Sequence, residues 1–142
     1  MNLERLSLKG IYILKILVEE KINVNIGALG RVYFPRGFYA YVGSAQKNLL
    51  KRLERHFEGG GKRFWHIDYL LAEKNVKIVG AYYKEADKNE ECLTAQKLGI
   101  YGFSVKNFGC SDCKCSSHLF RFNDYYLLDR LSNDLGFILF IP

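Results

Sequence analysis

The sequence contains few of the features that separate one domain from another, and this limits the number of domains that we expect. It contains two prolines in 142 residues and no low-complexity tract, which argues against a linker or a second domain. No apolar run approaches the roughly 18 to 20 residues that cross a bilayer, and the N-terminus lacks the pattern of a signal peptide. We therefore expect one cytoplasmic domain over residues 1–142 with no membrane partner, in which the four cysteines begin as thiols.

Apolar and aromatic residues are abundant, and positive charge is in excess. Hydrophobic residues make up 49% of the chain and aromatic residues 15%, which is enough for a folded core at this length. The net charge is +6. A charge of this sign is compatible with nucleic acid as a partner and equally with simple solubility, so composition alone leaves both interpretations open.

The periodicity of the apolar residues predicts a mixture of strands and helices. Strands are expected over 9–18, 22–26, 31–34, 38–42, 76–83, 119–122 and 137–141. Helices are expected over 48–57, 65–72, 89–98 and 124–131. We expect the first four strands to form an antiparallel meander and Gly99 to end the third helix. In the fourth strand, alternation places Tyr39 and Tyr41 on one face and Ala40 and Val42 on the other.

Two tripeptides in the expected strands say most about function. Gly10-Ile11-Tyr12 is followed about thirty residues later by Tyr41-Val42-Gly43. A tyrosine hydroxyl can exchange a proton and bond a phosphate oxygen or water, and the neighbouring glycine would let a substrate backbone approach. Arg52, on the basic helix that follows, could stabilise the charge that develops on a phosphorane. These residues predict phosphodiester cleavage, although both tyrosines could also be ordinary strand residues among the ten in the chain.

Acidic residues open the expected helix over 89–98. A carboxylate from Glu90 or Glu91 could bind one hard divalent cation, as phosphate chemistry often requires. The simpler alternative is that acidic residues in a first helical turn complement the helix dipole. On the residues alone, the dipole explanation is the stronger of the two.

Three cysteines and one histidine lie within nine residues, at Cys110, Cys113, Cys115 and His118. Such a set could bind zinc. Structural zinc sites, however, more often take their ligand pairs from separate segments than from one compact run. We therefore expect no closed zinc centre here, but a polar loop at the rim of the active site. A disulfide involving Cys92 is a third interpretation.

Basic and aromatic residues alternate just after the basic helix. This pattern suits contact with backbone phosphates and unstacked bases. The alternative is that Trp65 and Tyr69, four residues apart on a helix, belong to the core. We expect Trp65 to be largely buried and His66 to be a further site candidate. The residues expected to contact nucleic acid are Lys51, Arg55, Lys62 and Arg63.

Together these segments resemble a known family. The two tripeptides resemble the signature motifs of the GIY-YIG nuclease superfamily. Further segments resemble an archaeal-type branch called domain of unknown function 123, which occurs alone or fused to endonuclease III-like repair enzymes. These segments are 41–45, 55–56, 65–70, 91–92 and 111–120. The resemblance extends from about residue 9 to residue 122.

The resemblance implies an α+β fold, with a small antiparallel sheet flanked by helices, and metal-dependent cleavage of DNA. It implies that Tyr12 and Tyr41 take part in proton transfer and that Arg52 steadies the phosphate. Glu91 would bind one Mg²⁺ or Mn²⁺, and His56, one helical turn beyond the arginine, would be a further catalytic residue that projects into the same cleft as Arg52. The expected function is a DNA endonuclease of repair or processing, acting on branched or damaged DNA.

Two other functions fit the same residues. One is a nucleic-acid-binding module without catalysis, which needs only a basic surface. The other is a thiol- or metal-dependent enzyme centred on Cys92, Cys113 and His118, which needs a cysteine near a cation that lowers its pKa. A nuclease instead requires both tyrosines, an arginine and Glu91 in one cleft. Arg55 is the alternative to Arg52 in that role.

Overall fold

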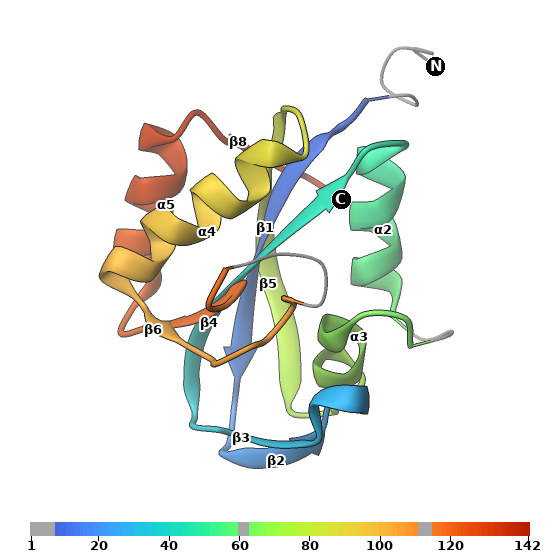
Figure 1. Ribbon diagram of the computed structural model, residues 1–142, viewed down its shortest axis with the longest axis vertical. Helices are drawn as coiled ribbons and strands as arrows, with labels where there is room; N and C mark the ends of the chain where they lie inside the picture. Colours follow the sequence, from blue (N-terminus) through green and yellow to red (C-terminus); the bar gives the residue numbers. More distant parts are fainter. Residues whose placement is uncertain (1–7, 60–62, 111–114) are drawn as a thin grey trace.

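The computed structural model describes residues 8–59, 63–110 and 115–142. Lys62 and Cys113, two of the expected site residues, lie outside the described residues. The fold is α+β, as expected. It consists of a six-stranded antiparallel sheet, a separate two-stranded hairpin and, in the described ranges, four α-helices (Figure 1).

The strands of the large sheet lie in the order β6 (Phe103–Ser104), β7 (Leu119–Phe122), β4 (Gly37–Ala45), β1 (Gly10–Val18), β5 (Val76–Glu85) and β8 (Ile138–Leu139). The hairpin consists of β2 (Ile22–Asn25) and β3 (Arg31–Phe34), joined through the 3₁₀ helix η1 (Gly27–Leu29). The helices are α2 (Leu49–Glu58), α3 (His66–Leu71), α4 (Asn89–Tyr101) and α5 (Tyr125–Asp134). Within the described residues, none of these helices is long and apolar enough to cross a membrane.

Alternation along the central strands gives the sheet two apolar faces. On β4, Tyr39 and Tyr41 face one core cluster, and Ala40 and Val42 face the other, which confirms the expected alternation. Helices α2 and α3 cover the tyrosine face, whereas α4 and α5 cover the opposite face (Figure 1). The two central strands are therefore buried on both sides, and the tyrosine face looks toward the basic helix α2.

Strand β1 pairs with β4 and not with the strand that follows it in the sequence. The pairing runs from Gly10 opposite Ala45 to Val18 opposite Gly37. Among the described residues, β2 and β3 pair only with each other, so the expected meander of the first four strands is wrong. The hairpin instead packs Phe34 into the core cluster on the tyrosine face of the large sheet. This connection brings the two tripeptides onto neighbouring strands.

Helix α4 is longer than expected, because Gly99 does not end it. The helix continues to Tyr101, and the N–H of Gly102 donates to the carbonyl of Leu98. A Cβ at Gly99 would lie 3.2 Å from the ring of Phe120. Gly99 therefore permits close packing of α4 on the sheet.

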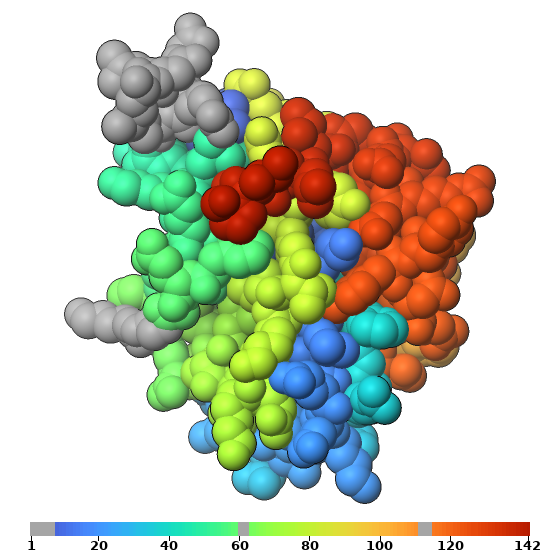
Figure 2. Space-filling view, turned by 180° about the vertical axis from the view of Figure 1, so that it is seen from behind, coloured from blue at the N-terminus to red at the C-terminus, as the bar shows by residue number. Residues whose placement is uncertain are grey.

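The last expected strand is reduced to the two residues of β8. Beyond it, the C-terminal segment (red) crosses β5 toward α2 (Figure 2). Phe140 lies 5.7 Å from Phe57 and 6.4 Å from Tyr83, between ring centroids. The N–H of Phe140 also donates to the carbonyl of Ala81 on β5 at 2.9 Å, so this backbone hydrogen bond and the aromatic contacts of Phe140 together hold the segment against the sheet.

Candidate functional site

A cavity of about 650 Å³ lies where the tyrosine face of the sheet meets α2, α3 and the beginning of α4. The four residues that a nuclease requires in one cleft all line it: Tyr12, Tyr41, Arg52 and Glu91. They come from four different elements, namely β1, β4, α2 and α4. The expectation that these side chains converge on one cleft is therefore confirmed.

The two tyrosines occupy adjacent antiparallel strands on the same face of the sheet. Tyr12 stands opposite Gly43, and Tyr41 stands opposite Leu14, so the tyrosines are diagonal neighbours. Their ring centroids are 6.3 Å apart. Burial raises the pKa of Tyr12 to about 12 and raises the pKa of Tyr41 well above its usual value. Both phenols are consequently protonated at neutral pH.

The glycines of the two tripeptides serve the packing of the sheet and not, as expected, the approach of a substrate. A Cβ on Gly43 would lie 2.5 Å from the hydroxyl oxygen of Tyr12, because the ring of Tyr12 lies directly over this glycine. A Cβ on Gly10 would collide with the backbone carbonyl of Lys84 on the neighbouring strand. Gly43 therefore determines where the Tyr12 hydroxyl is held.

His56 is not among the described residues that line the cavity, contrary to the expectation that it projects there with Arg52, and it supports Tyr12 from behind the cavity. The Tyr12 hydroxyl and His56 Nε2 are 2.8 Å apart, and the exposed fraction of His56 is only 5%. Burial lowers the pKa of His56 to about 4. His56 is consequently neutral at pH 7, and its contact with Tyr12 is a hydrogen bond between two uncharged groups. The residue thus acts on the cavity through Tyr12.

Arg52 is held in place by two contacts. Its Nη1 donates to the carbonyl of Ser44 at 3.2 Å, and its guanidinium lies 4.3 Å from the centre of the Trp65 ring. The guanidinium of Arg55 also lies over the Trp65 ring, 4.8 Å from the ring centre. The tryptophan is partly buried and packs against the core, as expected, and it also lines the cavity. One side of its ring lies against arginine side chains.

Arg55 also joins α2 to α3. Its Nη2 lies 3.8 Å from Asp68 Oδ2. The same carboxylate oxygen accepts from the backbone N–H groups of Phe64 and Trp65, at 2.9 and 3.0 Å. Arg52, and not Arg55, therefore faces the tyrosines, as the sequence analysis preferred.

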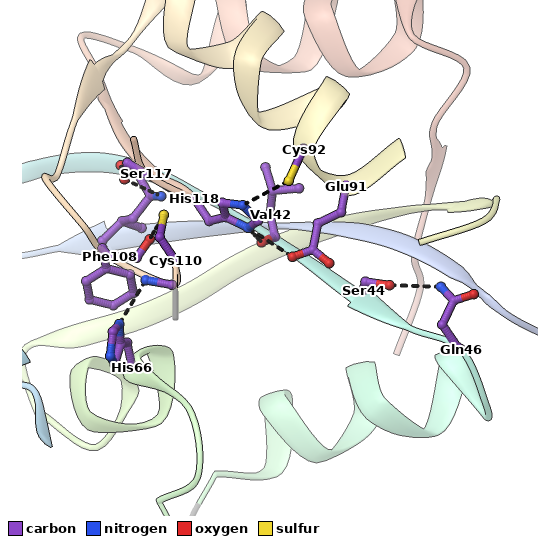
Figure 3. A network of polar contacts seen from close by, with 12 residues as sticks. Val42, Ser44, Gln46, His66, Glu91, Cys92, Phe108, Cys110, Ser117 and His118 are labelled. Carbon is purple, nitrogen blue, oxygen red and sulfur yellow. Dashed lines mark hydrogen bonds and ion pairs between the residues drawn. The ribbon is translucent and has the colours of Figure 1, made fainter. Parts of the chain in front are cut away.

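Glu91 reaches the cavity from the first turn of α4, where it meets His118 (Figure 3). Its Oε1 lies 3.0 Å from His118 Nδ1, and this nitrogen also lies 3.2 Å from the carbonyl oxygen of Val42. The other ring nitrogen, Nε2, lies 3.9 Å from Cys92 Sγ. His118 is only 1% exposed. It is therefore a central part of the site.

Glu90 points elsewhere, as expected from its position one residue away on the helix. It is not simply solvated, however, because its Oε1 lies 3.3 Å from Lys84 Nζ. Among the described residues that line the cavity, Glu91 is the only carboxylate. The two adjacent glutamates therefore have different surroundings.

The remaining expected residues are placed as follows. His66 lines the cavity, and its Nδ1 accepts from the backbone N–H of Gly109 at 2.8 Å. Burial lowers the pKa of His66, so this histidine is a neutral hydrogen-bond acceptor for the segment after β6. Lys51 and Arg63 are exposed.

The cavity lining also contains residues that sequence reasoning did not assign to the site, among them Ser44 and Lys88. Ser44 follows the second tripeptide directly, and its carbonyl holds Arg52. Lys88 precedes α4 and adds a positive charge to the lining. Their positions beside recognised motifs were the only sequence signal that could have identified them.

The model of one protein family, described as "Domain of unknown function DUF123", matches residues 11–136. The match covers most of the chain and includes all the described residues of the cavity. No curated protein and no solved structure matches the chain.

Proposed function

The chain belongs to the DUF123 family, and from this premise we propose that it is a metal-dependent DNA endonuclease related to the GIY-YIG nucleases. The observation that carries the proposal is the convergence of Tyr12, Tyr41, Arg52 and Glu91 on one cavity. Hydrolysis of a phosphodiester needs a positioned water, charge stabilisation and a metal ligand. These four side chains are suited to those tasks.

Arg52 is the proposed binding group for the scissile phosphate. Its contacts with the Ser44 carbonyl and the Trp65 ring hold the guanidinium before substrate arrives. An arginine presents five N–H donors, so one bond to Ser44 leaves several for phosphate oxygens. Because the group is already oriented, little reorganisation is needed when charge develops on the phosphorane.

The two tyrosines are proposed to hold the attacking water and a phosphate oxygen. Since both phenols have raised pKa values, they act as neutral hydrogen-bonding groups and not as phenolates. In our assignment Tyr12 donates its proton to neutral His56 at 2.8 Å. That orientation directs the lone pairs of the Tyr12 oxygen to a water in the cavity. Tyr41 then has its hydroxyl available for the substrate.

Glu91 is the proposed ligand of one Mg²⁺ or Mn²⁺. Its Oε1 is paired with His118, and we assign its second oxygen to the cation. A single carboxylate completed by waters and substrate oxygens fits Mg²⁺, which keeps several waters when bound to proteins. The cation would lower the pKa of a bound water and neutralise charge on the phosphate.

A basic surface next to the cavity supports DNA as the substrate. A second hollow, of about 400 Å³, is lined by four cations, Lys47, Lys51, Arg52 and Arg55, and by two carboxylates, Glu54 and Glu58; Arg52 lines both hollows. Phe64 has an exposed fraction of 66% at the edge of the cavity. Backbone phosphates can follow such a row of cations while an exposed aromatic ring stacks on an unpaired base.

The test compares Glu91→Gln with Glu90→Gln on branched, nicked and single-stranded DNA in the presence of Mg²⁺ or Mn²⁺. We expect Glu91→Gln to abolish cleavage and to preserve or strengthen DNA binding, because a negative charge near the phosphate is removed. Glu90→Gln removes only the contact with Lys84 and should cleave normally. Equal cleavage by both variants would exclude Glu91 from the mechanism. DNA binding without cleavage by the wild type would favour a binding module without catalysis.

A further inference from the structure

Three potential metal ligands meet beside the cavity, and the proposed nuclease chemistry uses none of them as a ligand. They are Cys92 on α4, Cys115 in the loop before β7, and His118 at the end of that loop. Their ligand atoms all lie within 4.8 Å of one another. His118 is buried, and both cysteines are half-buried.

The hydrogen bonds of His118 determine which of its nitrogens can bind a metal. Nδ1 faces the carboxylate of Glu91 at 3.0 Å and the carbonyl of Val42 at 3.2 Å. Both neighbours are acceptors, so Nδ1 carries the proton. Nε2 then presents its lone pair toward Cys92 Sγ, 3.9 Å away. Metal-binding histidines almost always donate their other N–H to a carboxylate or carbonyl in this way.

The distances suit zinc. With Zn–S bonds of about 2.3 Å and Zn–N bonds of about 2.0 Å, neighbouring ligand atoms of a tetrahedral site lie about 3.5 Å apart. The observed 3.9 Å between Cys92 Sγ and His118 Nε2 is close to this value. Two thiolates and one imidazole also form a soft donor set, which favours zinc over Mg²⁺.

The sequence analysis argued against zinc because the candidate ligands form one compact run. That argument no longer applies, because the structure brings Cys92 to the site from a different segment. Cys115 and His118 form a local pair, three residues apart, while Cys92 comes from a helix more than twenty residues earlier. Ligands from separate segments are typical of structural zinc sites. The expectation that residues 110–118 form no closed zinc centre considered ligands from the local loop alone.

We propose that Cys92, Cys115 and His118 bind one Zn²⁺ that ties the first turn of α4 to the loop before β7. This site is distinct from the Mg²⁺ or Mn²⁺ proposed at Glu91. Because Glu91 accepts from Nδ1 of His118, the zinc site also orients the carboxylate that faces the cavity. Glu91 thus does not bind the zinc itself, but accepts a hydrogen bond from the imidazole that does.

Metal content tests the proposal without any DNA. The full chain, stripped by a chelator and refilled with zinc, should hold about one zinc per molecule after dialysis. Cobalt in place of zinc should show the intense thiolate-to-metal absorption of a cysteine-bound ion. Cys92→Ser and Cys115→Ser should each lose both signals. Cys110→Ser, whose sulfur contacts the Phe108 carbonyl at 3.4 Å, is the matched control and should keep them.

Glu91→Gln tests whether Glu91 supports the zinc site through His118, because it should change the zinc affinity but not the number of zinc ions bound. Loss of the carboxylate that supports His118 should weaken zinc binding by roughly 10- to 100-fold while leaving about one zinc per chain at saturation. Absence of both zinc and the cobalt–thiolate absorption in folded wild-type protein would overturn the proposal. Undiminished zinc affinity in both cysteine variants would overturn it as well. If these variants do not fold, as judged by circular dichroism, the cobalt spectrum of the wild type decides.

Discussion

Replacing Gly43 by alanine would place a methyl group where the ring of Tyr12 lies. The new Cβ would be 2.5 Å from the Tyr12 hydroxyl oxygen and 2.8 Å from Cε2, whereas well-packed carbon atoms lie about 3.5–4.0 Å apart. Neither strand can easily yield, because β1 and β4 are paired along their whole length in the middle of the sheet. The Tyr12 ring must therefore move.

Two energetic costs result. Overpacking a well-packed core costs about 1–3 kcal/mol. Movement of the ring also breaks the 2.8 Å contact between Tyr12 and His56, and a buried polar group left without a partner costs about 1–3 kcal/mol. We expect Gly43→Ala to lower the free energy of unfolding by about 2–6 kcal/mol in total. For a chain of this size, Tm would fall by roughly 5–20 °C.

Urea unfolding of three proteins measures this effect: wild type, Gly43→Ala and the control Gly80→Ala. At Gly80 the nearest atom to a new Cβ is Lys15 Cδ at 3.4 Å, which belongs to a flexible side chain, so we expect a change below about 1 kcal/mol. In a Tyr12→Leu background the ring is absent, and the Gly43→Ala penalty should shrink by more than about 1 kcal/mol. Equal stability of the two alanine variants, or the same Gly43→Ala penalty in both backgrounds, would refute the reasoning.

Three further predictions concern pH, a buried charge and salt. Burial lowers the pKa of His56 to about 4, below the ordinary value of about 6.5, so the folded state resists protonation and stability should fall as pH drops from about 6.5 toward 4. In urea unfolding at these pH values, His56→Gln should lose less stability on acidification than wild type; parallel losses would contradict the assignment. Asp129→Asn removes the charge 2.8 Å from Lys15 Nζ, whose side chain is only 14% exposed, and should lower the free energy of unfolding by about 1–3 kcal/mol; an unchanged urea midpoint would argue against this pair. If the protein binds DNA as proposed, its DNA affinity, measured by fluorescence anisotropy, should fall steeply between about 50 and 200 mM salt, because exposed cations such as Lys51 and Arg63 would contact phosphates; a flat response would exclude that interface.

Local periodicity predicted most elements but not which strands pair. The alternation in β4 was sufficient to place Tyr41 on the tyrosine face, because the period of a strand is a local property. The partner of β1 depends on the path of the whole chain, and the hairpin β2–β3 was consequently assigned to the wrong sheet. Gly99 shows a similar limit. A glycine that ends a helix and a glycine that lets a helix approach a sheet look alike in the sequence.

Site residues could be predicted where they belong to a recognisable sequence motif. Contacts between side chains from distant segments could not be predicted. Glu91 and Cys92 are consecutive, yet they meet opposite nitrogens of the same imidazole, Nδ1 and Nε2 of His118. No spacing rule reveals this, because His118 lies more than twenty residues away in the sequence. The thiol and the carboxylate that the sequence presents as parts of rival functions therefore contact the same side chain in the folded protein.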